Sequence, residues 1–248
     1  MALKDKFTGK RERGLIVNAR RELHQSQSAG GPGTYIALIG NSLTPIIGTA
    51  SSTTGLTVSG GYLNVAANGT GRINLSAAPT INMTTDSAIF AVEASFLAGA
   101  STEFSIDANG FASNRQTVKL GGDHGAPGNI AAYQNYDALE LSSLTIPAGQ
   151  SVYLMLAYDG ASDTLSEYIR IGSTTTFVGS ITSPGFPTPP VSETISRFSF
   201  VELGGAAGFG VRNVHAIKFS NRGLPSDVSG LFAAYIASPS TQLNLAGL

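Results

Sequence analysis

The chain has 248 residues, no cysteine, 12% charged residues and a formal net charge of −1. The absence of cysteine excludes a disulfide framework, a thiolate metal site and a cysteine nucleophile. No apolar run approaches the roughly 20 residues that a bilayer-spanning helix needs. The apolar run at residues 14–17 is also too short for the core of an export signal. We therefore expect synthesis and assembly in a cytoplasm.

The basic side chains are concentrated at the N-terminus. Residues 1–22 carry seven basic and three acidic side chains, or +4, whereas the remaining residues carry eight basic and thirteen acidic ones, or −5. Leu15, Ala19 and Leu23 fall on one face of a short helix over residues 11–25. We expect residues 1–33 to be a docking arm, extended or short helical, that ends in a flexible Gly- and Ser-rich linker. The expected docking residues are Lys10, Arg11, Arg13, Leu15, Ile16, Arg20, Arg21 and Leu23.

The partner of this arm is open to three interpretations: an acidic protein surface, nucleic acid or an anionic membrane. Nucleic-acid binding usually needs a broader basic face with aromatic side chains for base stacking. Phe7 is the only Phe, Tyr or Trp before Tyr35. We therefore expect another protein as the partner, with no membrane and no nucleic acid, and keep a merely solvated tail as the alternative.

Residues 34–237 are expected to form one body of short strands. The sequence is rich in Gly, Ser, Thr, Ala and Val, and it lacks sustained helical periodicity outside its two ends, which favours an all-β fold. Residues 121–129 and 184–190 are expected to be loops. The expected strands span residues 35–39, 56–59, 62–65, 71–75, 88–96, 104–107, 116–120, 151–159, 164–172, 198–203 and 211–219.

Residues 151–172 predict a hairpin that turns at Asp159 and Gly160. Both faces of its first strand are apolar, as in a strand between two covering layers. The alternating residues are Val152, Leu154 and Leu156 on one face, and Tyr153, Met155 and Ala157 on the other.

The closing segment predicts a strand followed by a short helix. The apolar run at residues 211–219 ends at Asn221, and Ser226 or Asp227 can cap the helix that follows. Four apolar residues of this helix share one face. They are Val228, Leu231, Phe232 and Tyr235. Residues 238–248 form a C-terminal tail. We expect a subunit contact there through its apolar residues Leu243, Leu245 and Leu248.

These landmarks resemble, in order, those of laminin-G-like domains in the concanavalin A-like jelly-roll superfamily. The run NRGLPSDVSGL matches the family's closing pattern, and YLMLAYDG with LSEYIRIG matches its central hairpin. The resemblance implies an antiparallel β-sandwich jelly roll with a short C-terminal helix. Domains of this kind occur in virion proteins of tailed bacteriophages.

No catalytic set is found in the sequence. Glucanases with this fold need paired carboxylates at close spacing on one strand, and Glu93 stands alone on its strand. The three histidines, His24, His124 and His215, are far apart, and no G-x-S-x-G elbow is present. We expect a protein that is not an enzyme, with His215 a strand residue that has a local hydrogen-bond partner.

Two ligand sites are suggested. Asp159 and Asp163 correspond in position to loop aspartates that hold Ca²⁺ in some laminin-G and lectin domains, although plain turn chemistry also explains them. No other cofactor is expected. Sugar rings usually stack on Trp or Tyr, and the chain has no Trp, which leaves Tyr133, Tyr136, Tyr153 and Tyr158 as candidates. Tyr133 and Tyr136, in an exposed loop, are the expected glycan-binding residues.

Together these features suggest a non-enzymatic structural protein of a bacteriophage virion, a capsid decoration, fibre, or tail or baseplate component. It would dock on other virion proteins through its arm, display the jelly-roll body and assemble as a homo-oligomer in the host cytoplasm. The alternative is a glycan-binding receptor-recognition module of a tail fibre, directed at a host surface.

Overall fold

The computed structural model describes most of the chain after residue 32, in ten segments. The chain separates into two units, Met1–Gly31 and Pro32–Leu248. The expected docking arm, with all eight of its docking residues, lies outside the described residues. The described segments are residues 33–77, 79–82, 84–96, 104–107, 118–122, 130–134, 137–141, 151–182, 193–202 and 208–246.

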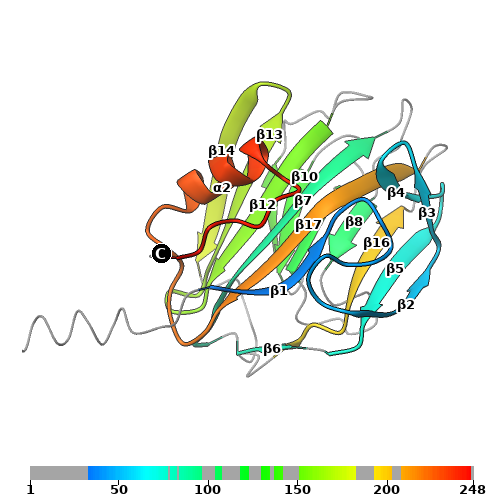
Figure 1. The fold of residues 1–248 in the computed structure, drawn as a ribbon. Coiled ribbons are helices and arrows are strands. Elements are labelled where there is room, and N and C mark those ends of the chain that lie inside the picture. Colours follow the sequence, from blue (N-terminus) through cyan, green and yellow to red (C-terminus); the bar gives the residue numbers. More distant parts are fainter. Residues whose placement is uncertain are drawn as a thin grey trace, which may run out of the picture. The chain divides into compact units, whose positions relative to one another are not determined.

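Two antiparallel sheets form the body (Figure 1). Sheet A has the strand order β14-β13-β12-β7-β17-β4-β3, and β1 also pairs with β17. Its strands are β1 (Thr34–Ile39), β3 (Leu56–Ser59), β4 (Tyr62–Val65), β7 (Ser87–Phe96), β12 (Ser151–Asp159), β13 (Thr164–Ile171), β14 (Thr174–Thr182) and β17 (Phe209–Phe219).

Sheet B has the strand order β11-β10-β9-β8-β16-β5-β2. A separate two-stranded pair joins β6 (Thr80–Ile81) to β15 (Glu193–Thr194). The strands of sheet B are β2 (Ala50–Thr54), β5 (Thr70–Leu75), β8 (Phe104–Asp107), β9 (Val118–Gly122), β10 (Ile130–Gln134), β11 (Asp137–Leu141) and β16 (Arg197–Glu202). The antiparallel β-sandwich expected from the sequence is confirmed.

The main core lies between the two sheets. Phe90 of β7 stacks on Phe198 of β16, with ring centroids 5.9 Å apart. Phe200 is also fully buried. Full burial of one such side chain stabilises a fold by about 1.5–3 kcal/mol. Leu154 and Leu156 of β12 face this core.

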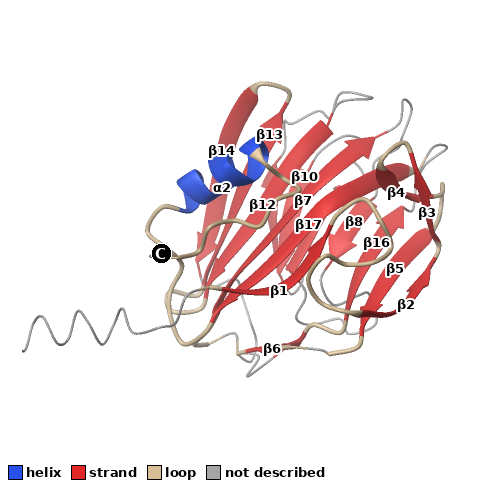
Figure 2. Ribbon diagram, in the orientation of Figure 1, coloured by secondary structure: helices blue, strands red, loops and turns tan. Residues whose placement is uncertain are grey.

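The helix α2 (Val228–Ala237) lies over the outer face of sheet A (Figure 2). A second apolar cluster lies beneath it. Asp227 caps this helix, because its carboxylate accepts a 2.7 Å hydrogen bond from the Gly230 backbone N–H. Leu231, Phe232 and Tyr235 bury its inner face against Met155 and Ala157 of β12, among others. The strand β12 is thus covered on both faces, as its sequence predicts.

The C-terminal tail packs on the same cluster. Leu243 and Leu245 are 7% and 8% exposed and lie beside α2 in the second cluster. Their own chain buries these two side chains, so they are not exposed for the expected subunit contact, and the third expected residue, Leu248, lies outside the described residues. No helix in the described part of the chain is long and apolar enough to cross a membrane.

Several strands differ from the expectation. Gly121 and Gly122, expected in a loop, belong to β9, and Tyr133, also expected in a loop, belongs to β10. These strands are rich in Gly and Ala and lack a marked alternation of apolar and polar residues, so tertiary pairing decides their conformation. The sequence also does not predict β2, β11 and β14. Tyr136 and the loop at 184–190 lie outside the described residues.

Candidate functional site

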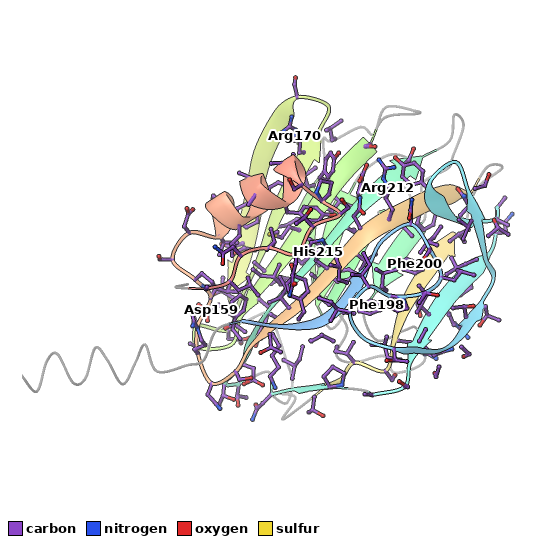
Figure 3. All side chains as sticks on the ribbon, in the orientation of Figure 1. Asp159, Arg170, Phe198, Phe200, Arg212 and His215 are labelled. Carbon is purple, nitrogen blue, oxygen red and sulfur yellow. The ribbon has the colours of Figure 1, made fainter. Side chains whose placement is uncertain are left out.

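The outer face of sheet A has two halves. α2 and the tail cover one half, and a row of polar and aromatic side chains crosses the other. Arg170 on β13 pairs in register with Tyr153 on β12, Tyr153 pairs with Glu93 on β7, and Glu93 pairs with Arg212 on β17. Directly paired residues project from the same face of a sheet. We call these four residues, together with Tyr62 on β4, the polar row. Figure 3 shows Arg170 and Arg212 toward the same end of the sheet, away from Asp159.

An ion pair lies at the centre of the row. Arg212 Nη2 donates a 2.7 Å hydrogen bond to Oε1 of Glu93, whose side chain is 0% exposed. Asn213 Nδ2 donates to Oε2 at 2.8 Å, and Ser151 also bonds to this carboxylate. Burial acts to raise the pKa of Glu93, but the hydrogen bonds outweigh it and the pKa is lowered. Glu93 is therefore a buried, charged and fully bonded carboxylate.

A β-bulge lets two consecutive residues reach this carboxylate. The register between β17 and β7 shifts between Arg212 and His215, and Asn213 has a φ of 54°. Asparagine tolerates this left-handed conformation better than most residues. In a regular strand Arg212 and Asn213 would point to opposite faces, whereas the extra residue of a bulge re-aims the side chain. The bulge therefore brings both donors to Glu93.

The side chain of Tyr62 reaches from β4 across the sheet to β12. The turn at Gly60 and Gly61, with φ of 60° and 78°, joins β3 to β4 just before it, as the sequence predicts. The Tyr62 hydroxyl lies 3.0 Å from Ser151 Oγ on β12, two strands beyond β17. A Cβ at Gly210 would lie only 2.8 Å from Tyr62 Cβ, so the ring needs a glycine beneath it. The Arg212 guanidinium lies over the ring, 4.3 Å from its centroid.

Tyr153 lies between the two arginines of the row. Its ring is half-buried and meets Tyr235 of α2 edge-on, with centroids 6.2 Å apart. Burial and, secondarily, the charge of Glu93 raise the pKa of Tyr153, so its hydroxyl keeps its proton. That hydroxyl makes no hydrogen bond to any described residue.

Arg170 stands at the outer end of the row. Its Nε donates a 2.9 Å hydrogen bond to the Gly172 carbonyl. Among the described residues, no acidic side chain forms an ion pair with it. Within the described part of the chain, the positive charge of its two terminal nitrogens is therefore uncompensated, on a side chain that is partly exposed.

His215 forms a separate polar contact beneath the tail. Nε2 lies 2.7 Å from the Pro239 carbonyl, which only accepts, so Nε2 carries the proton. Nδ1 then accepts from the Tyr35 hydroxyl at 3.1 Å, and that hydroxyl accepts from the Leu243 N–H at 2.7 Å. Burial lowers the pKa of His215 to about 4, against the hydrogen bond to Pro239. The expected role as a strand residue with a local partner is confirmed.

The two candidate calcium ligands lie at the β12–β13 turn. Asp159 Oδ1 accepts from the Ala161 N–H at 3.0 Å and from Ser87 Oγ at 3.3 Å. Asp163, with a φ of 48°, accepts from the Tyr158 hydroxyl at 3.0 Å. These are contacts of turn residues. Within the described segments, no group of three or more His, Cys, Asp and Glu side chains is placed to hold a metal ion.

The remaining predicted residues are only partly described. Tyr133 lies in β10, paired in register with Lys119 and Ala138. Tyr136, His24 and His124 lie outside the described residues. Of the polar row, the sequence suggests only Tyr153 as a candidate for sugar stacking, since the proximity of the five residues depends on strand pairing between distant segments.

Comparison with solved structures identifies the fold. Arcelin-5, a lectin-like defence protein from Phaseolus vulgaris, has a TM-score of 0.53 at 12% identity, covering 78% of this chain and 100% of its own. Lectin I from Ulex europaeus, in complex with the methyl glycoside of α-L-fucose, has a TM-score of 0.53 at 16% identity, with coverage of 76% and 99%. Winged bean acidic lectin, complexed with methyl-α-D-galactose, has a TM-score of 0.52 at 10% identity, with coverage of 76% and 98%.

The chain has a concanavalin A-like lectin fold. At these identities the likeness extends to the fold alone. The sequence matches no protein-family model and no curated protein. The expected concanavalin A-like sandwich is thereby confirmed, and the solved structures that share it here are legume lectins.

Proposed function

We propose that this chain is a non-enzymatic recognition module that binds a glycan through the polar row. The observation that carries the proposal is a partly exposed group of Tyr and Arg side chains on one face of a lectin-like sandwich. Tyrosine rings stack on the apolar faces of sugars, and guanidinium and hydroxyl groups bond to their oxygens. The sugar complexes of the Ulex and winged bean lectins support this class of ligand.

The row is fixed before any ligand arrives. Glu93 and the Tyr62 ring hold the guanidinium of Arg212, and Ser151 holds the hydroxyl of Tyr62. Side chains that are already ordered lose less conformational entropy on binding, which favours affinity. Tyr153 and Arg170 border this rigid centre and present the polar groups for direct contact.

The test is binding of the full chain to a panel of immobilised glycans, with dissociation constants for those that bind. We expect Tyr153→Ala to weaken binding at least tenfold, since one stacked and bonded aromatic contributes more than about 1.4 kcal/mol. Tyr133→Ala and Tyr136→Ala, at the positions that the sequence suggests, serve as comparison variants. Loss of binding in those two variants alone would move the site to sheet B and overturn this proposal.

A structural role in a bacteriophage virion is the second candidate, compatible with the first. It is favoured by the charge division of the sequence, +4 over residues 1–22 against −5 over the rest, and by the linker that follows. In this role the arm docks on another virion protein and a homo-oligomeric body is displayed. Full-length protein should bind particles that lack this component, and protein lacking residues 1–30 should not. Equal attachment of both forms would contradict docking through the arm.

A further inference from the structure

The polar row carries an excess of positive charge. Arg170 and Arg212 contribute two positive charges and Glu93 one negative charge, a sum of +1, on a body whose residues after 22 sum to −5. Glu93 is 0% exposed, whereas the Arg212 side chain is 32% exposed. A ligand that approaches the sheet therefore meets guanidinium groups first and the carboxylate only behind them.

We infer that the polar row selects acidic saccharides, and that Arg170 and Tyr153 bind an oxyanion group, a carboxylate or a sulfate, while Arg212 adds positive charge on the other side of Tyr153. This inference rests on the proposed function and specifies its ligand class.

The donors are suited to an oxyanion. Arg170 uses Nε for the Gly172 carbonyl, and no described residue bonds to its two terminal nitrogens, which form a fork suited to two oxygens. Tyr153 adds one O–H donor that has no described acceptor. Arg212 commits Nη2 to Glu93, and its exposed part adds positive charge from the opposite side. None of the three side chains offers an anion a competing negative charge.

The strand order sets the spacing of these donors. β13 and β17 are separated by β12 and β7. At about 4.8 Å per strand, the backbones of Arg170 and Arg212 therefore lie three spacings, or about 14 Å, apart. Tyr153 lies between them, next to Arg170, and the charges of both arginines act to lower the pKa of its hydroxyl. The spacing places one cation on either side of Tyr153.

A substitution at Arg170 can distinguish a loss of binding from a loss of folding. Removing Arg212 would leave the carboxylate of Glu93 buried without its cation, and the loss of folding would obscure any loss of binding. Arg170 has no ion pair in the described part of the chain, so R170Q should leave the fold intact. Arg222 is a matched control, because its Nε also donates to a nearby glycine carbonyl, that of Gly223, and it follows the far end of β17.

The experiment measures binding of the full chain to carboxylated, sulfated and neutral saccharides of matched backbone, at low and high salt. We expect the anionic saccharides to bind more tightly and to weaken with salt. R170Q should raise the dissociation constant about tenfold, as expected for a charge-assisted hydrogen bond, and Y153F a few-fold. R222Q should leave binding unchanged, and R170Q should leave the unfolding midpoint unchanged.

The outcomes separate the two proposals. If neutral saccharides bind as tightly as anionic ones, or if R170Q lowers the midpoint without changing binding, the inference is wrong while the glycan-binding proposal stands. If no saccharide of any class binds, the glycan-binding proposal fails, and the inference fails with it. The relative affinities for the carboxylated and sulfated ligands identify which oxyanion the site prefers.

Discussion

Arg212 donates a 2.7 Å hydrogen bond to the fully buried carboxylate of Glu93, a residue 119 positions earlier in the chain. This pair joins β17 to β7 at the centre of sheet A and fixes the face on which the polar row lies. The buried charge of Glu93 is tolerated because each described hydrogen-bond partner of its carboxylate is a donor.

The first prediction concerns this pair. Arg212→Met should lower the free energy of unfolding by about 3 kcal/mol, because it leaves the Glu93 charge buried without its cation. The double variant Glu93→Met with Arg212→Met should lose less than the single variant, because no charge remains to be buried. Urea unfolding of the two single variants and the double variant measures the coupling. Additive losses would contradict a coupled buried pair.

The second prediction concerns His215 and acid. Burial lowers its pKa to about 4 in the folded protein, from the usual 6.5, so the unfolded chain binds the extra proton first. The stability is therefore fully present above pH 6.5 and falls as the pH drops towards 4. The full loss amounts to about 3 kcal/mol, from the difference between 6.5 and about 4 at about 1.36 kcal/mol per pKa unit.

Unfolding midpoints measured across this pH range test the prediction. His215→Gln should flatten the pH dependence between 6.5 and 4, at some cost in stability at neutral pH. Asp86 and Glu93 also depend on pH, since hydrogen bonding lowers their pKa values against the opposing effect of burial. Their contributions are lost only at lower pH, below the ordinary carboxyl values of 3.8 and 4.5. A His215→Gln profile as steep as that of the unaltered protein would contradict the assignment.

The third prediction concerns the glycine beneath Tyr62. Gly210→Ala should displace the ring, because the added Cβ would lie 2.8 Å from Tyr62 Cβ. Such overpacking should cost about 1–3 kcal/mol of stability. Glycan affinity should fall as well, since the ring supports Arg212.

A second glycine variant serves as the control for this prediction. Gly48 has a φ of 87°, which also penalises a side chain, but it lies between β1 and β2, away from the polar row. Gly48→Ala should therefore lower stability and leave glycan affinity unchanged. Equal losses of affinity in the two variants would show that the effect of Gly210→Ala is not specific to the Tyr62 ring.

The fourth prediction concerns the tail. Leu243→Ala and Leu245→Ala should each lower the free energy of unfolding by about 2–4 kcal/mol, because each leucine fills space beside α2. Because these side chains are buried within their own chain, the molar mass in solution should not change. Light scattering and urea unfolding together test this, and dissociation into smaller species at unchanged stability would restore the subunit-contact expectation.

Much of the fold is predictable from local sequence, and the site is not. Strong apolar patterning identifies β12 and β17, and Asp227 marks the start of α2 through ordinary capping chemistry. The strands β10 and β11 lack such patterning and are ordered by their pairing. The sequence does not reveal a partner for Glu93, because the register of two distant strands brings Arg212 to it.

One sequence signal of the site was available. The residues of β17 that face the inter-sheet core are odd-numbered up to Val211 and even-numbered from Val214 onward. A step of three between consecutive inward residues breaks the two-residue period and indicates a bulge. It does not indicate which carboxylate the bulge residue Asn213 will reach, because that depends on β7.

The reversal of alternation at Asn213 divides β17 into two segments with independent constraints. Before it, the outward positions are occupied by Gly210 and Arg212 on the half that carries the polar row, and after it by Ile217 and Phe219 beneath the helix. Outward substitutions before the bulge therefore alter the polar row, and outward substitutions after it alter the packing beneath α2. If the polar row binds a ligand as proposed, the specificity of the domain and the closure of its fold are carried by separate stretches of one strand.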